Sequence, residues 1–554
     1  MLYEASHTPI DGADAPSQAA ASAPFAEIMV SISQQEYVQL KWDARYWQRQ
    51  HQRALSREAE LKDQIETLRA QVRDLRQRLF GRKTEKSTAQ SEQHRQPEAK
   101  RPRGQQRGSV GHGRVDFSHL PMREEECHFS EAERCCPKCG KAAAVFPGTE
   151  ESEIIEIEVQ AYRRVIRRKR YRPSCQCEDL PGIMTAFVPA RLIPKGRLGV
   201  SVWVEILLSK YLYAQPTNRL LQSWANIGFT PSQGTIIGGL KYLAPLFAPV
   251  VEALQARQLT EGLCHADETG WRVFEPMEGK VGYRWYLWVI RSTSAIVYVM
   301  APGRSAAVPL TYFSQLLVQT VVVCDRYAAY KKVARLIDLL LAFCWAHVRR
   351  DFLTLARSYP DTETWAMGWV ARIGTLYHLN DARLAVRDDP VRFTERDRQL
   401  RAHLEQMSAD RGAQLADASL RRAAHKVLVS LQNHWEGLTV FVDRPEIAMD
   451  NNAESALRNE VLGRKAYYGS GSVWAAHLAG SLFSLLMTLV HCWQINPRLW
   501  LTQYLQACAE HGHPPTDLSP FLPWTMSAQR LAALRWGGGS STAPPPNDIV
   551  IDTS

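Results

Sequence analysis

The stretch GLCHADETGWRV at residues 262–273 opens the part of the chain that decides its fold. This stretch and two that follow it, residues 283–290 and 295–300, are rich in β-branched and aromatic residues, which is typical of strands. The apolar run TVVVC at residues 320–324 indicates a buried strand, and residues 339–345 indicate a fifth. Residues 305–316 are predicted to form a helix. The sequence therefore predicts three strands in succession, followed by strands that alternate with helices.

This order of elements is that of the ribonuclease H-like α/β fold. In that fold the centre of the first strand and the end of the fourth strand lie side by side. Asp267 lies in the first predicted strand, and Asp325 directly follows the fourth. We therefore expect the two carboxylates to lie close enough to share a metal ion.

A third acid is expected from the stretch DNNAESALR at residues 450–458. Residues from about 360 to 440 are helical in pattern and charged, so we interpret them as an insertion into a catalytic core at residues 259–495. The chain then returns at DNNAESALR to add the last helix of the core, which carries Glu454. We predict that Asp450 is the N-cap of that helix and that the two asparagines are scaffolding.

Asp267, Asp325 and Glu454 together suit divalent metal ions and phosphoryl transfer. Carboxylates are hard oxygen ligands of the kind that Mg²⁺ or Mn²⁺ prefers. Two such ions about 4 Å apart can activate an attacking water or 3′-hydroxyl and stabilise the leaving oxygen of a phosphodiester. Taken singly, each aspartate also fits a turn or a helix cap, and Glu454 a solvated helix residue. Nearby candidates for holding the DNA backbone or offsetting transition-state charge are Arg458, Arg464 and Lys465.

His347 lies in the stretch CWAHVRR at residues 344–350, at the end of the fifth predicted strand. This position is compatible with a contact to substrate and equally with a structural role.

Composition sets the broad class of the protein. The chain has 554 residues, a net charge of +10 and a pI near 9.0. The length predicts two to four domains, and the charge favours a polyanionic partner such as DNA. No apolar run approaches the roughly 18 residues of a membrane span, and the N-terminus lacks a secretory pattern. We therefore expect a cytoplasmic protein without membrane contact.

Four of the eleven cysteines form two close pairs, Cys136 with Cys139 and Cys175 with Cys177. Four thiolates in two pairs suit tetrahedral Zn²⁺, which predicts a small zinc-binding domain at residues 115–182. The second pair is more tightly spaced than usual, so alternative ligands stay open: Cys127, His128 and Cys135.

A run of cations follows a predicted strand at residues 154–159, between the cysteine pairs. Such a run is either a solvated strand face or a strand that contacts phosphates. Beside a zinc knuckle in a basic protein, we favour the phosphate-contacting strand. The cations are Arg163, Arg164, Arg167, Arg168, Lys169, Arg170 and Arg172.

The N-terminal part of the chain is predicted to be a long helix at residues 28–83, between a disordered tail (1–27) and a flexible basic linker (84–114). Apolar residues alternate along this helix at spacings of four and three, as in the seam of a coiled coil. The seam either packs on the same protein or mediates self-association. Its residues are Leu61, Ile65, Leu68, Val72, Leu75 and Leu79.

Two further segments complete the predicted organisation. Residues 197–258 contain three helical segments, which form either a helix-turn-helix unit or, as we favour, a bundle packed on the next domain. Residues 496–554 are interpreted as a C-terminal segment and tail.

Several ordered motifs together make the chain, from about residue 40 onward, resemble the large catalytic subunit of the insertion sequence 66 family of transposases. The motifs are LFGR at 79–82, the paired cysteines, HADET at 265–269, DRYAAY at 325–330, CWAHVRR at 344–350, DNN at 450–452, GRK at 463–465, YGSGS at 468–472 and FLPW at 521–524. The resemblance implies a DDE-type recombinase whose acids are Asp267, Asp325 and Glu454. It also implies terminal inverted repeats as the DNA substrate, and small accessory proteins encoded by the same element.

The chain departs from the family pattern at one point. Two residues usually separate Asp-Asn-Asn from the glutamate, which is followed by Arg; here only Ala453 intervenes, and Ser455 replaces the Arg. Since one residue rotates a helix by about 100°, either the cap shifts by one residue or Glu454 points away and this copy is impaired. Glu460 is then the local competitor. The alternative function is a DNA-binding protein without catalysis, which binds element ends through its zinc and basic segments.

Overall fold

The structure is a computed structural model, and it describes residues 31–80, 122, 138–139, 141, 154–155, 157, 159–172 and 183–535, except 317 and 338. The chain divides into two compact units, Met1–Phe80 and Gly81–Ser554.

The described part of the first unit is one 47-residue helix, α1 (Gln34–Phe80). The helix begins with a capping box, because the Ser33 hydroxyl accepts the Glu36 N–H at 3.3 Å and the Glu36 carboxylate accepts the Ser33 N–H at 2.8 Å. Five of the predicted seam residues are about half exposed: Leu61, Ile65, Leu68, Val72 and Leu75. The predicted helix is confirmed, and its pairing as a coiled coil stays a prediction.

The second unit is organised around a five-stranded mixed sheet with the strand order β5-β4-β3-β6-β7. The strands β3, β4 and β5 are antiparallel neighbours, and β6 and β7 run parallel to β3. Their bounds are β3 (Leu263–Arg272), β4 (Arg284–Arg291), β5 (Ile296–Ala301), β6 (Val321–Cys324) and β7 (Leu340–Phe343). The predicted succession of three strands and then alternation is confirmed, and the order is that expected of a ribonuclease H-like fold.

Helices occupy the segments between and after the later strands. The predicted helix between β5 and β6 is α7 (Ala307–Phe313); α8 (Ala328–Leu336) and α9 (Trp345–Ser358) follow β6 and β7. The predicted insertion is helical, comprising η3 (Pro360–Thr362), α10 (Glu363–Leu384), α11 (Pro390–Leu415), α12 (Arg422–Asn433) and α13 (Trp435–Asp443). The chain then returns through α14 (Ala453–Ala456), α15 (Arg458–Tyr467) and α16 (Val473–Met487).

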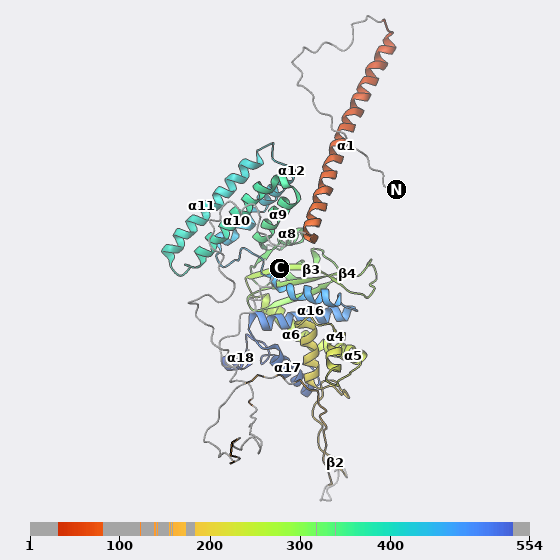
Figure 1. The fold of residues 1–554 in the computed structure, drawn as a ribbon, viewed down its shortest axis with the longest axis vertical. Coiled ribbons are helices and arrows are strands. Elements are labelled where there is room, and N and C mark those ends of the chain that lie inside the picture. Colours follow the sequence, from red (N-terminus) through yellow and green to blue (C-terminus); the bar gives the residue numbers. More distant parts are fainter. Residues whose placement is uncertain are drawn as a thin grey trace. The chain divides into compact units, whose positions relative to one another are not determined.

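The sheet separates two hydrophobic clusters, because side chains alternate between its faces. On β4, Leu287 and Val289 belong to one cluster, whereas Trp288 and Ile290 belong to the other. The first cluster, with Leu287 and Val289, includes residues of α16. The second, with Trp288 and Ile290, includes residues of the insertion helices. Figure 1 shows α16 and the insertion helices on opposite sides of the sheet.

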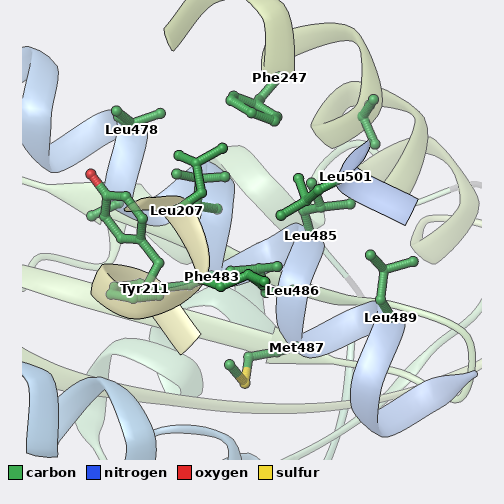
Figure 2. Packing of buried hydrophobic residues seen from close by; sticks show 14 of the residues in the cluster. Leu207, Tyr211, Phe247, Leu478, Phe483, Leu485, Leu486, Met487, Leu489 and Leu501 are labelled. Atoms are coloured by element: carbon green, nitrogen blue, oxygen red, sulfur yellow. The ribbon is translucent and has the colours of Figure 1, made fainter. Parts of the chain in front are cut away.

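The first cluster also takes in segments that the sequence suggests are separate domains. It joins the sheet to α3 (Val200–Leu207), η1 (Leu208–Leu212), α4 (Thr217–Ala225), α5 (Gln233–Leu243), η2 (Ala244–Phe247), α6 (Ala248–Gln258) and the C-terminal α17 (Pro497–His511). Figure 2 shows Leu207 of α3, Phe483 of α16 and Leu501 of α17 in this core. The predicted packing of a helical bundle on the sheet is confirmed, but residues 197–258 and the start of the C-terminal segment share one core with the sheet.

Helix α16 protects the outer edge of β5. The backbone N–H of Tyr298 donates to the Ser484 hydroxyl at 2.8 Å, and that of Ile296 donates to the Thr488 hydroxyl at 2.9 Å. These bonds satisfy edge groups that would otherwise be open to pairing with another strand. One turn before Ser484, Gly480 lets the helix approach, since a Cβ there would lie 3.3 Å from the Tyr298 carbonyl oxygen.

The expectation that no apolar stretch is long enough to span a membrane is too strict. Val473–Cys492, which is α16 continued by η4 (Thr488–Cys492), has the length and hydropathy of a span, as does Gln233–Gln258. In Val473–Cys492 the most apolar window is 67% buried within the fold, so packing against β5 explains its composition.

The predicted strand at residues 154–159 is wrong in the part of it that the structure describes. Ile154, Ile155, Ile157 and Val159 are exposed and belong to no strand. The described pairing nearby is a short ladder of β1 (Arg170–Tyr171) with β2 (Met184–Thr185), and the seven predicted cations are exposed. Of the predicted zinc ligands, Cys139 is exposed, and Cys136, Cys175 and Cys177 lie outside the described residues. The zinc-binding domain stays a prediction.

Helix α17 begins with a side-chain cap, because the Asn496 side chain accepts the Arg498 N–H at 3.0 Å. The short helix α18 (Ala528–Leu534) follows it in the described residues.

Candidate active site

The pairing of β3 with β6 brings Asp267 and Asp325 together. The parallel register aligns Leu263 with Val321 and His265 with Val323. Asp267 and Asp325 each lie two residues beyond the last aligned pair. Because side chains alternate with a period of two, both aspartates are expected on the same face of the sheet. The predicted placement of these two acids follows directly from the strand pairing.

The charge of Glu454 acts on Asp267. Burial raises the pKa of Asp267 to about 7, the N–H of Glu268 opposes this by donating to Asp267 Oδ1 at 2.8 Å, and the charges of Glu268, Asp325 and Glu454 raise it further. A divalent cation would relieve this repulsion. Among the described residues, however, the donor atoms that lie within 4.8 Å of one another are those of Glu454, His347 and Cys344, so Glu454 is grouped more tightly with α9 than with the two aspartates.

Glu454 is held by two side chains of α9. Its Oε1 lies 3.1 Å from His347 Nδ1, and its Oε2 lies 3.4 Å from Arg350 Nη2. These contacts direct Glu454 toward α9, and its charge reaches Asp267. Its role as the third catalytic acid stays a prediction.

Glu460, the local competitor, points into the core instead. Its side chain is completely buried, and burial raises its pKa to about 8. Tyr298 lies beside it, and Asp267 is not among the groups that shift its pKa.

Asp450 caps a helix, but a different one from that predicted. Its Oδ1 accepts the backbone N–H of Ala346 at 3.0 Å and the hydroxyl of Tyr377 at 2.5 Å. Ala346 is in the first turn of α9, where backbone N–H groups have no partner within the helix. Asp450 therefore fixes the start of α9, and the prediction that it caps the helix of Glu454 is wrong.

Asn451 closes the turn that leads into α14, whose N-cap position is Asn452. Its Oδ1 accepts the Ala453 N–H at 3.1 Å, while its Nδ2 donates to the Ala266 carbonyl at 2.8 Å. The next N–H, of Asn452, donates to His265 Nδ1 at 3.1 Å. The predicted scaffolding role of the asparagines is confirmed, and it ties the Glu454 helix to the strand residue that precedes Asp267.

Asp325 also makes a local bond, since its Oδ1 accepts the Tyr327 N–H at 2.8 Å just before α8. This cap leaves its other oxygen for a ligand. The helix-cap role and the metal-ligand role are therefore compatible at this position.

A buried ion pair lies next to the acids and has no clear signal in the sequence, because an acid beside Asp267 in a strand has no special spacing. Glu268, whose side chain is 1% exposed, lies 2.6 Å from Arg304 and accepts the Tyr330 hydroxyl at 2.8 Å. Burial raises the pKa of Glu268, and the charge of Asp325 raises it further, so this pair borders the site.

The three cations predicted near Glu454 differ in whether their side chains are free to contact DNA. Arg464 donates to the Thr269 hydroxyl at 3.1 Å and to the Gly270 carbonyl, so it fastens α15 to β3. Arg458 and Lys465 are exposed. Their contacts with DNA stay predictions.

Comparisons with known proteins identify the family of the chain. The model of the transposase IS66 family matches residues 195–478, which contain the sheet and all three acids. Two uncharacterized proteins of Sinorhizobium fredii are similar over most of their length: y4jD is 28% identical over 72% of this chain and 79% of its own, and y4hP is 24% identical over 74% and 77%.

Among solved structures, the Drosophila P element transposase strand transfer complex aligns with a TM-score of 0.31 at 9% identity, over 51% of this chain and 91% of that one. The Mos1 transposase paired-end complex with left transposon end aligns with a TM-score of 0.13 at 13% identity, over 31% and 70%. The family match spans more than half of the chain, and on that ground the chain belongs to the transposase IS66 family.

Proposed function

We propose that this transposase binds the terminal inverted repeats of a mobile element and catalyses metal-dependent DNA strand cleavage and strand transfer. The observation that supports the proposal is the parallel pairing of β3 with β6, which aligns Asp267 with Asp325, together with the effect of the Glu454 charge on Asp267. Three carboxylates from β3, β6 and α14 form a donor set for Mg²⁺ or Mn²⁺.

Each acid has a distinct supporting element. Strand pairing fixes Asp267 and Asp325, and Asn451 fixes α14 against β3, so Glu454 approaches from a third direction. Two bound ions would supply activation of the attacking water or 3′-hydroxyl and stabilisation of the leaving oxygen. The protein itself orients the scissile phosphate, and the exposed Arg458 and Lys465 offer charges for it.

DNA binding outside the site is assigned to the exposed run of seven cations between residues 163 and 172. None of these side chains is covered within the described residues, and they lie on an extended segment. Phosphate contacts of this kind supply affinity without sequence preference and weaken steeply with salt. Zn²⁺ held by the paired cysteines would order this segment.

Self-association is assigned to α1. Its seam places the β-branched Ile65 and Val72 in alternation with Leu61, Leu68 and Leu75, an arrangement that favours parallel two-stranded coiled coils. These side chains are about half exposed and so available to a second copy. Accessory proteins of the same element remain candidate partners.

Strand transfer in vitro tests the proposal. Full-length protein with Mg²⁺ and element-end DNA is expected to join 3′-hydroxyls to target DNA, whereas Asp267→Asn and Asp325→Asn are expected to lose at least about a thousandfold in rate while still binding ends. Glu405→Gln, on the exposed face of α11, is the matched control. Unchanged strand transfer in both aspartate variants would refute the assignment. End binding by an inactive wild-type protein would favour the alternative of a DNA-binding protein without catalysis.

A further inference from the structure

His347 and Glu454 approach each other from α9 and α14 at the rim of the three acids. We propose that His347 Nδ1 is a nitrogen ligand to the divalent ion held by Glu454, so that the site favours a transition-metal ion such as Mn²⁺ over Mg²⁺. This inference rests on the proposed function, because it concerns the same metal site.

The two facing atoms lack any other partner. His347 Nδ1 and Glu454 Oε1 lie 3.1 Å apart, and both atoms are buried without a hydrogen bond of acceptable geometry. Buried polar atoms almost always have a partner. A metal ion bound to both His347 Nδ1 and Glu454 Oε1 would supply that partner.

Their separation fits two neighbouring ligands of one octahedral ion. Donor atoms about 2.1 Å from a metal and at right angles to each other are about 3.0 Å apart, whereas at the tetrahedral angle they are about 3.4 Å apart. The observed 3.1 Å is close to the octahedral value. Side chains that are 21% and 33% exposed, for His347 and Glu454, leave a route from solvent.

Cys344 completes a potential three-donor group, but its hydrogen bonds engage it elsewhere. Its Sγ lies within 4.8 Å of the donor atoms of His347 and Glu454. The sulfur accepts the Asn451 N–H at 3.3 Å and donates to Asp450 Oδ1 at 3.7 Å. The facing donors of the pair are therefore one imidazole nitrogen and one carboxylate oxygen.

Both donors are held by the same stretch of chain. Asp450 fixes the first turn of α9, which carries His347, and Asn451 fixes α14, which carries Glu454. Arg350 occupies the Oε2 side of the glutamate and leaves Oε1 toward His347. An imidazole in this ligand set discriminates against Mg²⁺, which takes oxygen ligands, in favour of transition ions, which accept nitrogen.

Pulsed electron paramagnetic resonance of bound Mn²⁺ tests the inference without relying on activity. Untagged full-length protein is expected to show coupling of Mn²⁺ to ¹⁴N, replaced by ¹⁵N coupling after histidine labelling. His347→Gln is expected to keep Mn²⁺ but lose the nitrogen coupling, with Mn²⁺ affinity reduced at least about tenfold and Mg²⁺ affinity little changed. His425→Gln, an exposed histidine on α12, should behave as wild type.

The outcomes separate this inference from the proposed function. Bound Mn²⁺ and active strand transfer without nitrogen coupling in the wild type would overturn the ligand assignment and leave the proposed function intact; His347 and Glu454 would then be an ion pair. Absence of both Mn²⁺ binding and strand transfer would overturn both. If His347→Gln does not fold, His347→Asn provides the same assignment, and absence of nitrogen coupling in the labelled wild type would by itself overturn the inference.

Discussion

Replacing Glu460 by glutamine should stabilise the protein at neutral pH. The Glu460 side chain is completely buried in α15, and neither carboxylate oxygen accepts a hydrogen bond. The Tyr298 hydroxyl, whose interaction with the carboxylate partly offsets the rise in the Glu460 pKa, donates to the Ala456 carbonyl at 2.6 Å. Glutamine keeps the shape of the protonated carboxyl and cannot ionise.

The size of the effect follows from the pKa of Glu460. Burial raises this pKa from 4.5 to about 8, so the folded state binds a proton that the unfolded chain releases above pH 4.5. The stability contributed by this proton is complete below pH 4.5 and is lost as pH rises through 8. At about 1.4 kcal/mol for each pH unit, wild-type protein loses about 3 kcal/mol by pH 7, which glutamine would avoid.

Thermal and urea unfolding between pH 4.5 and 8 provide the measurement. Glu460→Gln should have a melting temperature a few degrees, about 4 °C, above wild type at pH 7, because the shift per kcal/mol falls below about 2 °C in a domain larger than 250 residues, and nearly the same melting temperature at pH 4.5. The exposed Glu405→Gln should change neither value. A variant that is destabilised at pH 7, or whose advantage does not depend on pH, would show that Glu460 is ionised and paired in the folded protein.

Three further substitutions test the scaffold and the assembly. Asn451→Ala removes the turn bond before α14 and the bond to the Ala266 carbonyl, so it should cost about 1–2 kcal/mol in urea unfolding and slow strand transfer; Asn451→Asp keeps the turn bond and should be milder in stability. Gly480→Ala should lower stability by about 1 kcal/mol or more in thermal melts because its Cβ would crowd β5, whereas Gly374→Ala in α10, with open space around it, should be neutral or stabilising. Leu68→Asp should abolish self-association in sedimentation experiments on the full chain, and equal dimerisation of wild type and variant would exclude the α1 seam as the interface.

The features that the sequence predicts well are those with local signals. Runs of β-branched and aromatic residues locate the strands, and the strand order then brings Asp267 next to Asp325 without any further information. The helical insertion likewise follows from its charge and the lack of strand pattern. These predictions succeed because the pattern of apolar and β-branched residues within a short stretch indicates both a strand and its burial.

The features that it predicts poorly depend on contacts between distant segments. Asp450 is placed before a helix in the sequence, but its carboxylate reaches the first turn of α9, more than a hundred positions earlier. The proline- and glycine-containing stretch near residues 180–197 suggests a boundary, yet α3 beyond it packs into the same core as α17. No local pattern distinguishes a linker between domains from a loop that leads into a shared core.

The position of Glu454 is set by anchors and not by the phase of a long helix. Successive residues from 450 to 452 bond to three different partners: Ala346 at the start of α9, Ala266 of β3, and His265 of the same strand. Helix α14, which follows these bonds, is only four residues long. The chain has one residue fewer between Asn452 and Glu454 than the family pattern, and this loss falls at the start of a short helix, so it does not rotate a long helix about its axis. The glutamate can therefore face Asp267 despite the shortened spacing, and the Asp-Asn-Asn stretch is what makes the third acid tolerant of that change.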